Sequence, residues 1–230
     1  MLDPQQPGVV VVGPWRAPAE ALAPFASALM RWQQRSGWPV LADGLSGLRG
    51  WPGLQLVHGY DLLLAEGHQL PAAPQLLRLG SMPASRRLQQ WIAAAQGPQL
   101  LITEHDPRNL DASGTATQRC SAGLAAWLDQ LDLHQAAGPA RPSAATCAWA
   151  ERWWRADRLL QQHLDAQWPA QSSLSGLGSE PALARALSRA LPAGVPLMLA
   201  SSSPVRDWES FAAADAPHRL VVGFRGASGI

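Results

Sequence analysis

The chain has 230 residues, of which 47% are hydrophobic and 15% are charged, so it can bury a core and its composition argues against disorder. A formal net charge of +1 argues against a general nucleic-acid binder, which carries a basic excess. No stretch approaches the roughly 20 apolar residues of a membrane span, and no signal peptide is evident. We therefore expect a cytoplasmic protein without a membrane span.

Apolar runs of strand length alternate with helical patterns along the first part of the chain. Strands are predicted at residues 8–13, 38–43, 75–80 and 99–104. Helices are predicted at residues 18–35, 60–65, 85–95 and 121–131. The run GVVVVG at 8–13 is typical of a strand that is covered on both faces. The alternation predicts a Rossmann-like, doubly wound α/β fold with a mostly parallel sheet.

Ligands of doubly wound sheets bind beyond the carboxyl ends of the strands. The candidate loops here are residues 13–17, 44–50, 81–87 and 104–114. In the first loop, Pro14 and Trp15 stand where a dinucleotide site needs glycines, so we expect a Rossmann-like domain without a nucleotide. A nucleotide-binding protein is therefore the least favoured of the functions considered.

Two groups of residues could suggest a metal site. The loop after the fourth strand holds Glu104, His105, Asp106 and Asp111. Three consecutive residues cannot all face one ion from an extended backbone, so a solvated loop is favoured over a metal site. Cys120 and Cys147 lack a metal-binding or redox spacing, and we expect both to be buried and reduced.

The second part of the chain begins with a long helix at residues 144–168. Its apolar stripe favours packing onto the domain over a membrane-surface role. The Ser/Gly-rich stretch at 169–180 indicates a boundary. We therefore expect a central Rossmann-like domain at 1–170 and an incomplete second α/β domain at 171–230. In the latter, Ser179 caps a helix, strands lie at 196–203 and 218–224, and a helix lies at 205–214.

The last two predicted strands are each followed by small residues and an arginine. SSSPVR places Ser202 and Arg206 after one strand, and FRGASGI places Arg225 and a turn of small residues after the other. Hydroxyls and helix amino-terminal amides suit a phosphate, and a guanidinium suits a carboxylate. The alternative is a Ser turn that caps the helix beside an exposed arginine. Two such strand ends favour a site for an anionic small molecule.

These segments resemble a known family. LASSSPVRDWESF followed by GFRGASGI is similar to the GNS-x-x-x-R and NRGASGIDG segments of the MenD family, the 2-succinyl-5-enolpyruvyl-6-hydroxy-3-cyclohexene-1-carboxylate synthases. GWPVLADGLSGLR and LRLGSMPASRRLQQW are similar to further segments, in order along nearly the whole chain. The resemblance implies a transferase that uses thiamine diphosphate and a divalent metal, Mg²⁺ or Mn²⁺. This chain resembles its central domain and the start of its diphosphate-binding domain.

The reaction implied by the resemblance is the decarboxylation of 2-oxoglutarate and the addition of the succinyl unit to isochorismate, toward menaquinone or phylloquinone. The activating Glu of the family and its metal-binding segment have no counterpart here, so we expect a fragment that is inactive alone, without catalytic residues or metal ligands. The full-length family implies a homo-oligomer. The alternative is a non-catalytic α/β binding or scaffold module.

The resemblance also assigns roles to individual residues. Substrate binding falls to four arginines, Arg206, Arg225, Arg87 and Arg86, and Arg87 is favoured over Arg86. Cofactor binding falls to Ser202, Gly229 and Ile230, and Ile230 would lie between the two rings of a bent thiamine. The alternative for Arg86 and Arg87 is an exposed first helical turn. Ser201 departs from the family, which more often has Asn at that position.

Overall fold

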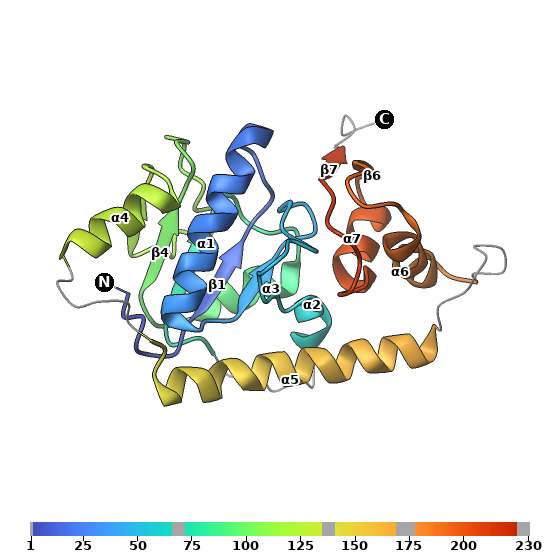
Figure 1. The fold of residues 1–230 in the computed structure, drawn as a ribbon, viewed down its shortest axis with the longest axis horizontal. Coiled ribbons are helices and arrows are strands. Elements are labelled where there is room, and N and C mark those ends of the chain that lie inside the picture. The colour runs from blue at the N-terminus through green and yellow to red at the C-terminus, as the bar shows by residue number, and fades with distance from the viewer. Residues whose placement is uncertain (1, 66–71, 135–140, 169–177, 225–230) are drawn as a thin grey trace.

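The computed structural model describes residues 2–65, 72–134, 141–168 and 178–224 (Figure 1). These residues form a five-stranded sheet with helices on both faces, followed by a smaller two-stranded sheet with two helices. All strand pairs of the two sheets are parallel. The predicted doubly wound α/β fold is therefore confirmed.

The larger sheet has the strand order β2-β1-β3-β4-β5. Its strands are β1 (Val9–Val12), β2 (Val40–Ala42), β3 (Leu76–Leu79), β4 (Gln99–Ile102) and β5 (Gln118–Cys120). In the register of the sheet, Val10 lies opposite Val40 on one side and Leu77 on the other. The first four strands lie within the predicted ranges. The edge strand β5 was not predicted, because Gln-Arg-Cys is too polar and too exposed to show an apolar run.

Four helices complete this part of the chain, and their ends follow local chemistry. They are α1 (Leu22–Ser36), which follows the 3-10 turn η1 (Ala19–Ala21), α2 (Tyr60–Leu63), α3 (Arg86–Ala94) and α4 (Leu124–His134). Gly37 ends α1 with a φ of 65°, a conformation that costs glycine little. The Ser85 hydroxyl begins α3 by accepting a hydrogen bond from the Leu88 amide.

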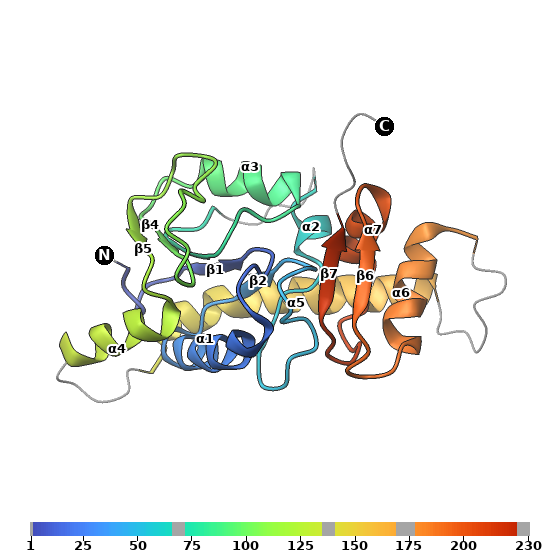
Figure 2. The ribbon, with the colours of Figure 1, turned by 90° about the horizontal axis from the view of Figure 1, so that it is seen from above.

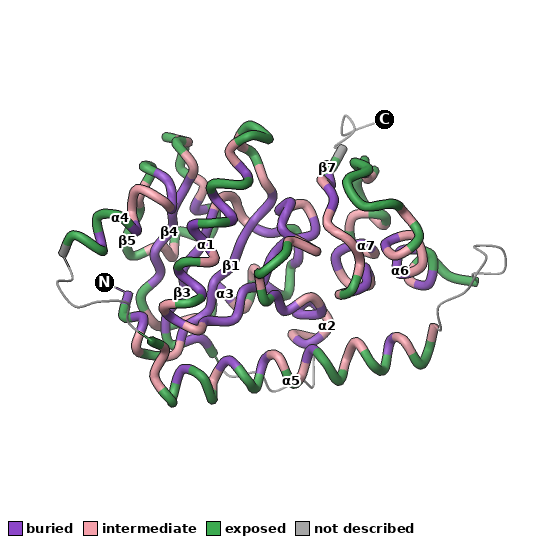
Figure 3. Tube along the Cα trace, viewed as in Figure 1, coloured by how far each residue is buried: buried purple, intermediate pink, exposed green. Residues whose placement is uncertain are grey.

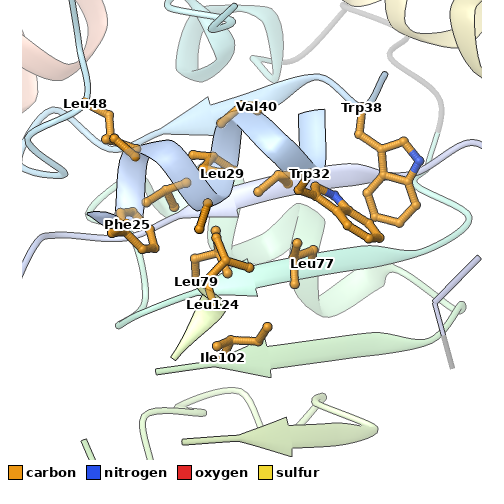
Figure 4. Packing of buried hydrophobic residues seen from close by; sticks show 14 of the residues in the cluster. Phe25, Leu29, Trp32, Trp38, Val40, Leu48, Leu77, Leu79, Ile102 and Leu124 are labelled. Atoms are coloured by element: carbon orange, nitrogen blue, oxygen red, sulfur yellow. The ribbon is translucent and has the colours of Figure 1, made fainter. Parts of the chain in front are cut away.

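The sheet is buried on both faces because successive valines of β1 point to opposite sides. Val10 and Val12 pack against α1 and α4, and Val9 and Val11 pack against α2, α3 and the long helix α5 (Ala144–Gln167). Figure 2 shows α1 and α4 on one face of the sheet and α3 on the other. In Figure 4, Leu29 and Trp32 of α1 lie over Leu77 and Leu79. Figure 3 shows how buried residues concentrate in these strands.

The helix α5 runs beneath both parts of the chain (Figure 1). Ser143 caps it, and Trp153 is fully buried with its ring edge-on to Trp91 at a centroid distance of 5.6 Å. Both oxygens of the buried Asp157 carboxylate accept backbone hydrogen bonds, from the His58 and Gly59 amides. The predicted packing of this helix onto the domain is therefore confirmed. Within the described residues, no helix is both long and apolar enough to cross a membrane.

The smaller sheet pairs β6 (Leu197–Ala200) with β7 (Val221–Phe224). Its helices are α6 (Glu180–Ala190), which Ser179 caps as predicted, and α7 (Ser203–Phe211). The buried Arg185 of α6 joins this part to α5, because its guanidinium binds the Asp165 carboxylate at 2.7 Å and the Phe211 carbonyl of α7 at 3.3 Å.

The two cysteines differ from the prediction that both are buried. Cys147 is exposed in the first turn of α5, and Cys120 is only partly buried on the edge strand β5. Both positions lie at the margin of the domain, where one side of the element faces solvent. The prediction of two buried cysteines is therefore wrong.

Candidate functional site

A cleft of about 1050 Å³ lies between the carboxyl edge of the larger sheet and α7. One wall consists of the loops after β1, β2 and β3 and the start of α3. The other consists of the end of β6, the helix α7 and Gly223 of β7. The chain passes from β1 outward to β2 and then returns to β3 on the other side of β1, which makes this edge the point where the strand order reverses. The residues that line the cleft are Pro14, Arg16, Leu45, Asp61, Met82, Pro83, Ala84, Ser85, Arg86, Arg87, Gln89, Ser201, Ser202, Val205, Arg206, Asp207, Glu209, Ser210, Phe211 and Gly223.

Four of the seven predicted site residues line this cleft together. Arg86 and Arg87 come from the first turn of α3, and Ser202 and Arg206 come from the start of α7. Residues more than one hundred positions apart in the sequence are thereby brought to one cavity. The other three, Arg225, Gly229 and Ile230, lie outside the described residues.

The neighbouring arginines of α3 have different surroundings. The Arg87 guanidinium donates to a carboxylate oxygen of Asp61 at 2.8 Å, and its side chain is 47% exposed. Arg86 is exposed and makes no ion pair with any residue that the structure describes. Arg87 is thus held in one direction, whereas Arg86 is free to meet an anion that enters the cleft.

Ser202 has an unusual backbone conformation at the end of β6. Its φ is 76°, which is rare for a residue with a side chain, and its hydroxyl does not cap α7. The Arg206 guanidinium, one turn further along, reaches toward that hydroxyl at 3.5 Å. The Ser cap of the alternative is therefore absent, whereas Arg206 is exposed as that alternative expects, and both residues line the cleft.

The floor between the two walls is a buried polar network. The Glu209 carboxylate of α7 accepts hydrogen bonds from the Tyr60 hydroxyl and from the Gly44 amide. Arg49 donates to the Glu209 carbonyl at 2.9 Å and lies 3.4 Å from its carboxylate. Burial, with the nearby Asp43 carboxylate, raises the pKa of Glu209 to about 8 despite Arg49. Glu209 is therefore mostly protonated at neutral pH.

Asp43 belongs to the same floor. Its two carboxylate oxygens accept from the Leu45 amide at 2.8 Å and from the Ala84 amide at 2.7 Å. It is fully buried, and this burial raises its pKa. Asp43 thereby ties the loop after β2 to the loop that leads into α3, whose first turn carries Arg86 and Arg87.

Sequence reasoning missed Arg16 and the buried floor. Arg16 lies in the loop after β1, is exposed in the cleft and has no ion-pair partner among the described residues. The signal that could have found it is the strand order, because the loop after β1 lies at the reversal point. The contacts of Tyr60 with Glu209 join residues 149 positions apart, and no local pattern predicts them.

The carboxylates of the loop at 104–114 already have partners in the chain. Glu104 accepts from the Leu124 amide at 2.8 Å, Asp106 pairs with Arg108, and Asp111 pairs with the buried Arg78. The hydrogen bonds from Arg108 lower the pKa of Asp106 to about 2. No group of three potential metal ligands is found in the described ranges, so these residues do not fit the metal that the resemblance implies.

The position of a nucleotide pyrophosphate is filled by protein. The Trp15 amide donates to the Leu45 carbonyl at 2.9 Å, and the Trp15 ring packs on Phe25 at a centroid distance of 5.0 Å. The cavity that remains beside it measures about 50 Å³, whereas small-molecule sites occupy about 300–1,000 Å³. The larger cleft, with four arginines, is therefore the candidate site.

The arrangement of the cleft suits a ligand with several carboxylates. Guanidinium groups stay charged at any physiological pH and bind carboxylates through paired hydrogen bonds. Arg16, Arg86, Arg87 and Arg206 approach it from three different loops or helices. For a thiamine coenzyme, the described chain offers the Ser202 hydroxyl and the small residue Gly223 at the strand ends, and no group of three potential metal ligands.

Comparisons with known proteins agree with this architecture. The sequence family described as the middle domain of thiamine pyrophosphate matches residues 4–199. A 2-succinyl-5-enolpyruvyl-6-hydroxy-3-cyclohexene-1-carboxylate synthase of Synechococcus sp. (strain RCC307) is 56% identical over all of this chain, which covers 38% of that protein. Proteins of the same name from Synechococcus sp. (strain CC9311) and Prochlorococcus marinus (strain MIT 9313) are 53% and 45% identical. The chain spans less than two fifths of the length of these relatives.

Proposed function

The chain belongs to the family of thiamine pyrophosphate middle domains, and we propose that it forms the substrate-binding wall of a 2-succinyl-5-enolpyruvyl-6-hydroxy-3-cyclohexene-1-carboxylate synthase. The observation that carries the proposal is the shared cleft of Arg86, Arg87 and Arg206. In this proposal the whole enzyme decarboxylates 2-oxoglutarate and adds the succinyl unit to isochorismate. Both substrates are dicarboxylates, so the site needs fixed cations.

In this proposal the arginines bind and orient the carboxylates. Arg206 of α7 lines the cleft together with Arg86 and Arg87 of α3. Arg225 follows β7 in the sequence, outside the described residues, and we assign it the same role from the resemblance. Thiamine diphosphate, when bound, supplies the chemistry of decarboxylation. The resemblance assigns Ser202, Gly229 and Ile230 to that coenzyme; Ser202 lines the cleft, and the other two lie outside the described residues. The strained backbone of Ser202 supports its place in this list, because such conformations gather at ligand sites.

Several parts of the proposal rest on the resemblance alone. They are the Mg²⁺ or Mn²⁺ ion, the homo-oligomeric state of the full-length protein, its cytoplasmic location and its place in menaquinone or phylloquinone biosynthesis. The division into a central domain at 1–170 and the start of a diphosphate-binding domain at 171–230 is supported by the two separate sheets. Because the described residues offer no metal site, we propose that the chain alone is inactive.

A titration of the 230-residue chain with 2-oxoglutarate, followed by NMR, tests the proposed binding role. We expect weak, saturable binding, with a dissociation constant of roughly 1 mM. Arg206→Ala should weaken it by about tenfold or more, since a charge-assisted hydrogen bond contributes about 1.5–3 kcal/mol. Arg31→Ala, a control on α1 whose partners are Asp129 and Asp132, should leave it unchanged. Equal binding by wild type and Arg206→Ala would contradict the proposal.

A further inference from the structure

Asp61 is a buried carboxylate at the edge of the cleft that accepts hydrogen bonds from three side chains on two elements, α3 and α7. Only 8% of the residue is exposed. It lies in the short helix α2, which packs between α3 and α7. A buried charge is costly unless it is paired and hydrogen-bonded, so the hydrogen bonds to Asp61 indicate a role in holding its neighbours in place.

The three donors reach the two oxygens of Asp61 from different sides. The Ser85 hydroxyl, at the amino terminus of α3, donates to Oδ1 at 2.6 Å. The Arg87 guanidinium donates to Oδ2 at 2.8 Å, and the Ser210 hydroxyl of α7 donates to the same oxygen at 2.9 Å. Asp61 therefore joins the wall that carries Arg87 to the wall that carries Arg206.

The link to α7 acts on Arg206 through helix geometry. Ser210 follows Arg206 by four residues, so both side chains lie on the same face of α7, and both line the cleft. The neighbouring residues repeat the connection, because the Tyr60 hydroxyl donates to Glu209 just as Ser210 donates to Asp61. Tyr60 and Asp61 of α2 thus bind Glu209 and Ser210 of α7 through two side-chain hydrogen bonds, which fix the position of α7 relative to the larger sheet.

We propose that Asp61 is a positioning residue that sets the direction of Arg87 and the distance from Arg87 to Arg206 across the cleft. The inference rests on the proposed function, since the arginines need a fixed separation only if they hold one ligand with two carboxylates. We assign Asp61 a positioning role because its two oxygens already accept from three protein donors. Its charge holds one Nη of Arg87, which lines the cleft, and the guanidinium keeps further N–H groups that can donate to a ligand there.

The same NMR titration with 2-oxoglutarate tests this inference on variants of the 230-residue chain. Asp61→Ala removes all three contacts and should raise the dissociation constant about tenfold. Asp61→Asn can keep an oxygen toward Arg87 and Ser210 while its amide donates to Ser85, so it should recover part of the affinity. The same measurement on Arg87→Ala and on the Asp61→Ala/Arg87→Ala double variant completes a cycle.

A matched control separates positioning from loss of stability. Asp111 is also buried and pairs with the Arg78 guanidinium at 2.8 Å, but it does not line the cleft. Asp111→Asn should lower the thermal midpoint, measured by circular dichroism, at least as much as Asp61→Asn does, and it should leave the dissociation constant unchanged.

The cycle distinguishes the possible outcomes. If Asp61 positions Arg87, Asp61→Ala should weaken binding at least threefold less in the Arg87→Ala background than in wild type. Equal weakening in both backgrounds would show that Asp61 acts independently of Arg87 and would overturn the inference. The inference would also be overturned if Asp61→Ala left the dissociation constant unchanged while Arg206→Ala raised it. If neither arginine variant changes binding, the proposed function itself fails, and this inference fails with it.

Discussion

The buried Glu209 makes the stability of the chain fall as the pH rises through neutrality. Only 3% of Glu209 is exposed, and burial raises its pKa from 4.5 to about 8. Between these two values the folded state holds a proton on Glu209 that the unfolded state has lost. The folded state therefore binds more protons, and the free energy of unfolding decreases with increasing pH.

The window from pH 6.5 to 8 shows this effect with little opposition from His58. Burial lowers the pKa of His58 from 6.5 to about 4, so His58 adds stability as the pH rises from 4 to 6.5 and opposes Glu209 there. At pH 6.5 half of the His58 side chains are still protonated in the unfolded state, so above this pH His58 offsets the Glu209 effect by only about 0.4 kcal/mol. The Glu209 contribution then decreases by up to about 1.4 kcal/mol per pH unit and levels off near its own pKa. We expect a net loss of about 1–1.5 kcal/mol across the window.

Urea denaturation at several pH values measures this loss. Glu209→Gln should reduce the slope to less than half, because a Gln carbonyl still accepts from the Gly44 amide but does not titrate. Glu180→Gln, exposed at the start of α6, should keep the wild-type slope. Stability that is constant or increases from pH 6.5 to 8, or a Glu209→Gln slope equal to that of wild type, would refute the reasoning.

Two further predictions concern packing. Trp153→Ala should cost about 3–5 kcal/mol of unfolding free energy in urea, because it empties the space between α5 and Trp91, and a loss below about 1 kcal/mol would contradict this packing. Gly13→Ala should lower the thermal midpoint strongly, since its Cβ would lie 1.7 Å from the Ser81 carbonyl oxygen. The control Gly178→Ala should leave the midpoint unchanged, because its Cβ would meet nothing within 4 Å. Similar midpoints for the two variants would contradict the close approach of the loops after β1 and β3.

The elements that could be predicted from the sequence are those with strong local signals. The four valines of β1 indicate a strand covered on both faces, and the structure buries all four. Ser179 was predicted to cap α6 from its place before a proline and an apolar pattern, and its hydroxyl does accept from the Ala182 amide. β5 could not be predicted, because its three residues form a strand only through pairing with β4.

The residues of the candidate site also divide into those that could be predicted from the sequence and those that could not. Arg86, Arg87 and Arg206 were found through segments that resemble a family, and the cleft brings them together. Asp61 and Glu209 could not be found, because their roles arise from contacts between α2 and α7 that span 149 residues. An isolated Asp in YDLLLA is also typical of the solvated face of a short helix.

The central claim is that this chain supplies the wall of the cleft that binds substrate in a synthase. The most direct test replaces the matching segment of the Synechococcus sp. (strain RCC307) protein, 56% identical to it, with this chain and measures synthase kcat/KM with 2-oxoglutarate and isochorismate. We predict that the chimera keeps activity within about tenfold of that protein and that Arg206→Ala in the chimera removes most of it. A folded chimera without activity, or one that Arg206→Ala leaves fully active, would contradict the claim.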